Sequence, residues 1–333
     1  MKLFYKKYID NYTRILYFLG IPIEYKKEFI SEKSIINNQV KIFNFKFNIK
    51  KKKKIKKYTN NLFLNKTAKT DALMYMRPIR NLFSKINSVE TIVLGSSAAR
   101  AGYIENEKSV NFGIDAQDLY YSYQLFHKYK TIIPNLKNVI LCYNVFSSGN
   151  DLDLHPQKYR MAYYSAYFDI PYKNKLLAIS EKIIDFEKKL YTLDKYINKN
   201  LKNIPIDYYP ILDSGFKTQS ELEIQANLDI KLAYKNTMLH YVEKIADETT
   251  SQNLNFYIVL MPRIPSVLHL YPEKEKLFES IYSFEKKYQN IKIISAFSSC
   301  EFQDSDFMDL THLKKQGAQK LTNIINNSIG IEK

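Results

Sequence analysis

The chain has 333 residues, 45% of them hydrophobic and 25% charged, which is the composition of a soluble globular protein with an ample core. Its net charge of +16 is unevenly distributed. Residues 1–88 hold 21 of the 50 basic residues but only five of the 34 acidic ones, so the remainder has 29 of each and is neutral. The two cysteines, Cys142 and Cys300, exclude a disulfide framework, and no Cys/His spacing of a metal site is present.

The basic excess predicts two regions, a basic N-terminal accessory region over residues 1–88 and a larger domain over 89–333. Within the first region, the segment 41–49 places Phe43, Phe45, Phe47 and Ile49 at period two, which indicates a strand. A run of lysines follows, with seven in the eight residues 50–57. These are Lys50, Lys51, Lys52, Lys53, Lys54, Lys56 and Lys57.

Three interpretations of the lysine run stay open. It is a solvated loop, or it binds an anionic membrane surface, where each lysine contributes about 1 kcal/mol, or it binds nucleic acid. The third is disfavoured because no recognised nucleic-acid module accompanies the charge. No apolar stretch approaches the roughly 20 residues that span a membrane, and no signal peptide is recognisable. We therefore expect a cytoplasmic location. If the lysine run binds an anionic membrane surface, the protein would be peripheral to the inner face of the membrane.

From Val89 onward, strand and helix patterns alternate, which predicts an α/β domain with a parallel sheet. The order indicates five strands, with a helical insertion between the third and the fourth. The expected strands are 91–94, 109–112, 138–143, 255–260 and 291–294, and the expected helices are 117–129, 175–200, 220–249, 273–288 and 314–327.

The first strand ends in Gly95-Ser96-Ser97 and passes directly into small helix-forming residues. In an open α/β sheet the carboxyl end of a strand is where ligands bind, and a helix N-terminus favours developing negative charge there. Either serine is therefore a candidate nucleophile, provided that the chain supplies a base.

A candidate base lies near the other end of the chain, in Asp309-Leu310-Thr311-His312. An acid and a histidine three residues apart before a helix can face the same side. The carboxylate would then bind one imidazole nitrogen and leave the other as a base, which is the logic of a Ser–His–Asp triad.

Gly-Ser-Ser after the first strand, together with Asp-x-x-His before a last helix containing Gly317-Ala318, resembles the SGNH/GDSL hydrolase family over about residues 89–330. The resemblance implies a three-layer α/β/α sandwich with a parallel five-strand sheet of flavodoxin-like order. It also implies Ser97 rather than Ser96 as nucleophile, His312 as general base and Asp309 as the orienting acid.

The resemblance further implies an oxyanion hole formed by the N–H groups of Ser97 and Ala116 and by the Asn144 side chain. Asn111-Phe112-Gly113-Ile114-Asp115-Ala116 is similar to the family's second motif, with Ala116 where glycine usually stands. By position, Asn144 takes the place of the family's oxyanion asparagine. A literal Gly149-Asn150-Asp151 further on is the alternative.

Arg263 follows Met261-Pro262 at the end of the fourth strand, where it could reach the cleft and hold an anionic or sugar group. The expected function is serine-dependent acyl-ester chemistry, as an esterase or deacetylase, on an O-acylated substrate of the surface-glycan class. Two alternatives stay open, an O-acetyltransferase of polysaccharide biosynthesis and a non-catalytic protein that binds a glycan or a partner. Hydrolysis needs no cofactor or metal, whereas transfer needs acetyl-CoA or another acetyl donor.

Overall fold

The structure is a computed structural model that describes residues 66–174 and 218–330, together with five strands among residues 4–49. These five are β1 (Phe4–Tyr8), β2 (Thr13–Phe18), β3 (Ile21–Ile30), β4 (Ile35–Ile42) and β5 (Phe45–Ile49). They pair antiparallel in chain order. The expected strand over 41–49 is therefore divided, because its first residues end β4, and Ile42 pairs with Phe45 of β5.

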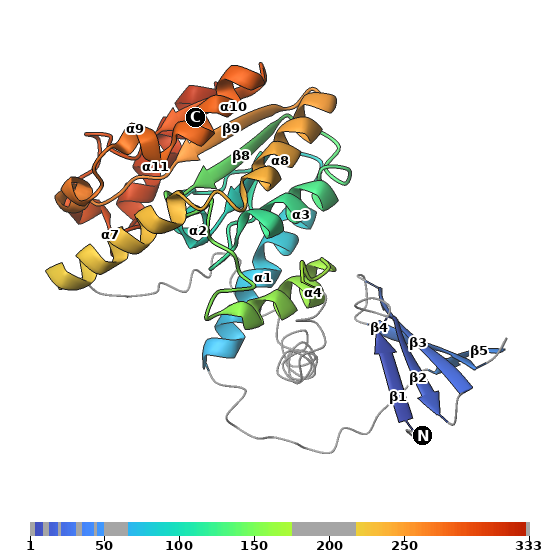
Figure 1. The fold of residues 1–333 in the computed structure, drawn as a ribbon. Coiled ribbons are helices and arrows are strands. Elements are labelled where there is room, and N and C mark those ends of the chain that lie inside the picture. The colour runs from blue at the N-terminus through green and yellow to red at the C-terminus, as the bar shows by residue number, and fades with distance from the viewer. Residues whose placement is uncertain are drawn as a thin grey trace.

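A second five-stranded sheet forms the centre of the α/β unit (Figure 1). Its strands are β6 (Thr91–Gly95), β7 (Ser109–Asn111), β8 (Asn138–Tyr143), β9 (Asn255–Leu260) and β10 (Ile291–Ser295). They lie in the order β10-β9-β8-β6-β7, and every pair is parallel. Numbered along the chain, this is the flavodoxin-like order 2-1-3-4-5, so the fold expected from the sequence is confirmed.

Position in the sheet explains the sequences of the strands. Every residue of β6 and β8 is buried, because helices cover both faces of the inner part of a parallel sheet. The edge strand β10 is only partly buried, with Ile291 and Ile294 buried and Lys292 and Ser295 exposed. Continuous apolar runs therefore occur where the strand is central.

The helices of the α/β unit fill the outer layers (Figure 1). They are α1 (Lys66–Ser84), α2 (Ser97–Gly102), α3 (Leu119–Tyr129), α4 (Met161–Phe168), α7 (Gln219–Ala233), α8 (Leu239–Ser251), α9 (Lys274–Leu277), α10 (Glu279–Lys287) and α11 (Lys315–Ile329). Helix α3 packs against α8, and α2 packs against α11. Right-handed crossovers place these two pairs on opposite faces of the sheet, which gives the three layers.

Helix α1 lies within the basic region 1–88 yet packs onto the α/β unit. Its Tyr75 is fully buried and stacks on Tyr163 of α4 at 4.7 Å between ring centroids. Its Asn81 donates to Glu105 at 2.7 Å. The division of the chain into functional regions at residue 88 stays a prediction, but the packed core includes this earlier helix.

Two helical patterns that read as continuous are broken in the structure. The pattern over 220–249 becomes α7 and α8, separated at Asn236, whose φ is 52°. The backbone N–H of Met238 then donates to Ser148, so tertiary contact holds the break. The pattern over 273–288 becomes α9 and α10, and Phe278 (φ −115°) interrupts the helical backbone between them.

Some expectations fall on residues outside the described part. These are the lysine run over 50–57, Phe43 and the helix expected over 175–200. The insertion between β8 and β9 is described for α4, α7 and α8.

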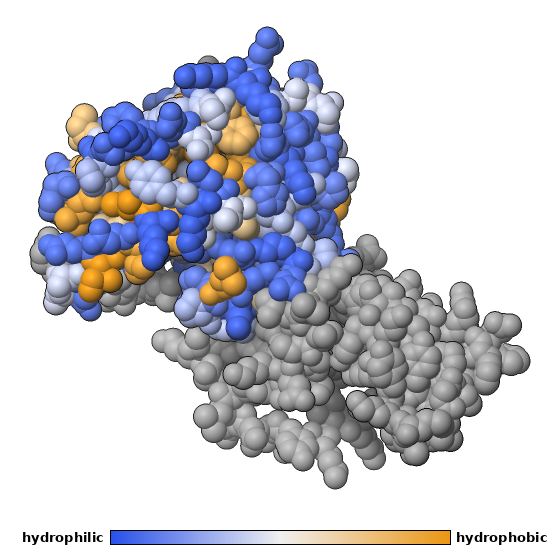
Figure 2. All heavy atoms as spheres, viewed as in Figure 1, coloured by the Kyte–Doolittle hydropathy of each residue, from blue (hydrophilic) through white to orange (hydrophobic). Residues whose placement is uncertain are grey.

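Among the described residues, no helix is both long enough and apolar enough to cross a membrane. Figure 2 shows a face of the α/β unit on which hydrophilic residues predominate and hydrophobic ones gather toward α7. Ile224 and Leu228, one turn apart on α7, are among the exposed apolar side chains.

Gly95 ends β6 in a conformation that a side chain would strain. Its φ is 136°, and an added Cβ would lie 2.7 Å from the carbonyl oxygen of Cys142 on β8. We expect Gly95→Ala to lower the free energy of unfolding by about 3 kcal/mol, measured by chemical denaturation. Gly330→Ala is the control, because nothing lies within 4 Å of its added Cβ, and it should cost about 1 kcal/mol. Equal losses in the two variants would contradict the close approach of β6 and β8.

Asp118 caps α3 from a buried position, with its carboxylate accepting from the N–H groups of Tyr121 and Leu152. Burial raises the pKa of this carboxyl from 3.8 to about 6, although the two hydrogen bonds oppose the rise. The folded protein therefore binds this proton more tightly than the unfolded chain does. The stabilising contribution is complete below pH 3.8 and is lost as the pH rises through about 6.

We expect the free energy of unfolding of the wild type, minus that of Asp118→Asn, to fall by about 2 kcal/mol between roughly pH 4.5 and pH 7. Asparagine still caps the helix but does not titrate, so the difference isolates this carboxyl. Denaturant titrations at several pH values measure it. A difference that is constant over this range, or that increases, would contradict the burial of a charged Asp118.

Candidate active site

Ser97 lies at the carboxyl end of the central strand β6. The strand ends at Gly95, Ser96 is the N-cap of α2, and Ser97 is the first residue of that helix. The strand register pairs Gly95 with Cys142, so the end of β6 lies beside the end of β8. The close approach at Gly95 places the two serines at the edge of the sheet where the parallel strands end.

Asp309 and His312 lie on one short loop before α11. An antiparallel bridge between Phe307 and Leu313 closes this loop, and the N–H of Met308 donates to the His312 carbonyl at 2.8 Å. One carboxylate oxygen of Asp309 accepts from the backbone N–H of His312 at 2.8 Å. The other lies 2.7 Å from His312 Nδ1. The loop thus fixes both side chains relative to each other.

His312 Nε2 lies 2.8 Å from Ser97 Oγ, and the two residues are 215 positions apart in the sequence. Because the carboxylate of Asp309 can only accept at Nδ1, the neutral imidazole carries its proton there and leaves Nε2 as the acceptor. The hydroxyl of Ser97 then donates to Nε2. The structure therefore brings the three residues together in the order that activation of a serine requires.

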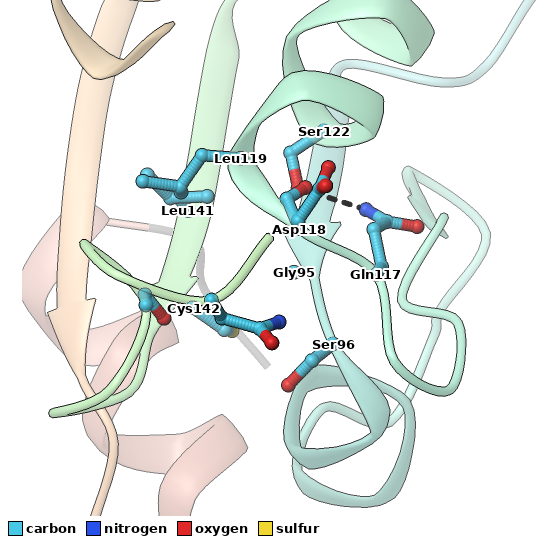
Figure 3. A pocket seen from close by; sticks show the side chains of 10 residues that line it. Gly95, Ser96, Gln117, Asp118, Leu119, Ser122, Leu141 and Cys142 are labelled. Atoms are coloured by element: carbon cyan, nitrogen blue, oxygen red, sulfur yellow. Dashed lines mark hydrogen bonds between the residues drawn. The ribbon is translucent and has the colours of Figure 1, made fainter. Parts of the chain in front are cut away.

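The two adjacent serines have different side-chain hydrogen-bond partners. Ser96 Oγ accepts from Asn144 Nδ2 at 3.0 Å, whereas Ser97 Oγ contacts the His312 imidazole at 2.8 Å. Figure 3 shows Ser96 on the wall of a small pocket formed with residues such as Gln117 and Asp118. The choice of Ser97 over Ser96 therefore has a geometric basis in the contact with His312.

Asn144 is the third polar group at this edge of the sheet. It follows β8 directly, is 1% exposed, and its backbone N–H donates to Ser147 Oγ at 2.9 Å. Among the described residues, its buried Oδ1 has no hydrogen-bond partner. The alternative asparagine, Asn150, lines the pocket beside Ser96, but Asn144 contacts Ser96 directly.

Ala116 lies in the loop between β7 and α3, and this loop runs alongside the end of β6. The N–H of Ile114 donates to the Gly95 carbonyl at 3.2 Å. Ala116 has a φ of 57°, in the left-handed region that favours glycine. Among the described residues, neither the N–H of Ala116 nor that of Ser97 donates to a backbone carbonyl.

Arg263 does not reach an open cleft, which differs from the expectation that it would hold a substrate group. It is 2% exposed, and its Nη2 donates to Asp229 of α7 at 2.9 Å. Tyr271 donates its hydroxyl to the same oxygen at 3.0 Å, and Arg263 lies over the Phe146 ring at 5.5 Å. The guanidinium thus ties the insertion helix α7 to the end of β9.

Asp229 and the buried pair of Arg100 and Asp115 beside the site were not predicted from the sequence. Asp115 lies in the motif 111–116, but the partners of each pair are 15 and 34 residues apart, so no local pattern indicated the pairing. Within the described ranges, no group of three or more His, Cys, Asp or Glu residues is placed to hold a metal ion.

Three solved structures are similar to the chain at low identity. One is described as an acylhydrolase from Bacteroides fragilis, with 8% identity, a TM-score of 0.39, and coverage of 78% of this chain and 96% of that one. A lipolytic protein of the G-D-S-L family from Desulfitobacterium hafniense has 11% identity, a TM-score of 0.36, and coverage of 72% and 98%. A GDSL-like lipase from Parabacteroides merdae has 11% identity, a TM-score of 0.31, and coverage of 74% and 97%. No protein-family model and no curated protein matches the chain.

The buried pair predicts a structural cost for Asp229. Asp229→Ala leaves the Arg263 charge buried without its carboxylate, which should lower the free energy of unfolding by about 3–5 kcal/mol in chemical denaturation. Glu273→Ala is the control, because it removes an exposed partner of Lys276 and should leave the unfolding midpoint unchanged. If Asp229→Ala instead kept full stability, Arg263 would not depend on this partner.

Proposed function

We propose that the chain is a serine-dependent enzyme of SGNH/GDSL type that acts on acyl esters. One observation carries the proposal: His312 Nε2 lies 2.8 Å from Ser97 Oγ while its Nδ1 lies 2.7 Å from Asp309. The parallel sheet of flavodoxin-like order supports it, because this order places Ser97 and Asn144 at the same edge.

In the proposed reaction, His312 Nε2 takes the proton of Ser97 as Oγ attacks the ester carbonyl carbon. The carbonyl oxygen becomes an oxyanion that the N–H groups of Ser97 and Ala116 and the Asn144 amide would bind. Collapse of this intermediate breaks the ester bond, and the leaving alcohol takes the proton from His312. Ser97 then carries the acyl group.

Water completes hydrolysis. It loses a proton to His312 as it attacks the acyl-enzyme, and the proton returns to Ser97 Oγ as the acid leaves. No metal or redox cofactor enters these steps. If a sugar hydroxyl replaced water, the same steps would transfer the acyl group, and an acetyl donor such as acetyl-CoA would be needed.

For the substrate, we propose an O-acylated saccharide of the surface-glycan class. Two resemblances support this class: that of Ser97, Asp309 and His312 to the SGNH/GDSL family, and that of the basic N-terminal region, an apolar run followed by lysines, to the leaders of some bacterial surface-glycan biosynthesis enzymes. Acetate release from an acetylated oligosaccharide, measured with and without an acceptor sugar, separates hydrolysis from transfer. Release that is unaffected by the acceptor would count against transfer.

A serine-directed fluorophosphonate tests the nucleophile. We expect it to label the wild type and not Ser97→Ala, and we expect this variant to lose at least about 10³-fold in kcat on p-nitrophenyl acetate. Ser96→Ala is the matched control and should still be labelled, because the hydroxyl that contacts His312 is intact. Intact-protein mass spectrometry gives the readout.

Labelling of Ser97→Ala at the wild-type rate would contradict the role of this serine. Absence of labelling and of ester turnover in a folded wild type would contradict the enzyme. It would favour the alternative of a non-catalytic protein that binds a glycan or a partner through the same fold.

A further inference from the structure

A buried ion pair joins the helix that begins at Ser97 to the loop that contains Ala116. Arg100 of α2 donates Nε to Asp115 Oδ1 at 2.9 Å, and its Nη2 lies 2.9 Å from the same oxygen. The two side chains are only 6% and 12% exposed. The pair is therefore shielded from solvent. Removal of one partner of such a buried pair is costly, because it leaves the other charge buried and uncompensated.

The pair lies close in the chain to the proposed nucleophile and to the proposed oxyanion donor of the loop. Arg100 lies three residues after Ser97, and Asp115 directly precedes Ala116. The backbones of α2 and the loop are also in close contact. An added Cβ at Gly113 would lie 2.5 Å from the backbone nitrogen of Arg100. The loop thus lies against α2 at Gly113 and is held there by charge at Asp115.

Other contacts tie down the loop on both sides of Ala116. Before it, the Asn111 side chain donates to the carbonyls of Ala99 and Tyr103 of the α2 segment at 2.9 and 3.0 Å. After it, Gln117 donates to Ser122 of α3 at 3.0 Å. Between these anchors, the side chain of Asp115 is the one that reaches back to α2.

The backbone of Ala116 is in a strained conformation. Its φ of 57° brings Cβ close to the backbone, a steric cost in free energy that is absent for glycine. A residue in this conformation persists only where its surroundings determine it. Asp115 directly precedes Ala116, so its ion pair with Arg100 can hold the backbone of Ala116 in this conformation.

We propose that Arg100 and Asp115 are positioning residues that hold the Ala116 N–H toward the oxygen of the reacting ester. The inference rests on the proposed function, since it assigns the pair to the oxyanion hole of the same site. Neither side chain touches the reacting atoms. The pair couples the helix that carries the nucleophile to the loop that carries the donor, so that the two N–H groups keep one relative orientation.

Steady-state kinetics on p-nitrophenyl acetate test the proposal. Asp115→Asn removes the charge but keeps the shape, and we expect kcat to fall by about 10²-fold with KM within about threefold. The pH dependence of kcat/KM should keep the midpoint of the wild type, because Ser97, His312 and Asp309 are unchanged. Because a partly unfolded sample would also lower kcat at constant KM, kcat is compared only at concentrations of folded enzyme, established by circular dichroism.

A rescue variant addresses the conformation of Ala116 directly. Adding Ala116→Gly to Asp115→Asn should restore kcat by about tenfold, because glycine adopts positive φ without strain. Glu248→Gln is the matched control. It removes a carboxylate of α8 that pairs with His127 and Lys130 at the C-terminal end of α3, whereas the loop precedes the N-terminal end of α3, and kcat should stay within twofold.

Arg100→Lys provides a second variant should Asp115→Asn fail to fold by circular dichroism. Lysine keeps the charge but lacks the planar fork, and we expect kcat to fall by about tenfold. A folded Asp115→Asn, or otherwise a folded Arg100→Lys, with kcat within twofold of the wild type would overturn the positioning role. So would a double variant that shows no rescue. Absence of turnover in the wild type would instead contradict the proposed function.

Discussion

The close approach of two parallel strand ends is the constraint on which the candidate site depends. β6 and β8 meet at Gly95 and Cys142, where no Cβ fits between the strands. This approach brings Ser96 within a hydrogen bond of Asn144 and starts α2 at the next residue, Ser97. A bulkier residue at Gly95 would separate the strands and would displace both serines together.

Long-range pairing completes the site from the other end of the chain. The bridge between Phe307 and Leu313 closes a loop whose polar groups bind one another, so contacts within the loop fix the orientation of Asp309 and His312. These contacts restrict the conformations of the two side chains. The serine and the histidine can therefore hold a hydrogen bond across 215 positions of the sequence.

Buried ion pairs hold the segments around this edge of the sheet. Arg100 and Asp115 tie α2 to the loop after β7, and Arg263 and Asp229 tie β9 to the insertion helix α7. Buried charges need their partners, so each pair selects one arrangement of the elements that carry it. Arg263 was expected from its place after a strand end to bind a substrate, but it is buried against α7 and pairs with Asp229. The sequence does not reveal whether a helix covers a side chain at such a place.

The sequence by itself determined what local chemistry encodes. Strand patterns, four of them largely apolar and the fifth the short segment at β7, predicted all five strands of the α/β unit, and the alternation with helices implied that they are parallel. Gly-Ser-Ser and Asp-x-x-His are short patterns, so Asp309, His312 and two candidate serines could be proposed from spacing and order, and the family resemblance selected Ser97. The alanine at position 116, where the family usually has glycine, was visible in the sequence, but its positive φ was not.

Only the tertiary structure decided which distant groups meet. The backbone N–H of Met238 donates to the Ser148 carbonyl, and this contact holds the break between α7 and α8. Helix α1 packs onto the α/β unit through the stacking of Tyr75 on Tyr163 of α4. The pairing of Asp115 with Arg100 and of Asp229 with Arg263 has no local signal, because an ion pair is specified by positions in space rather than by neighbours in the chain. Periodicity and turn chemistry act over a few residues, whereas burial and charge pairing are set by the whole fold.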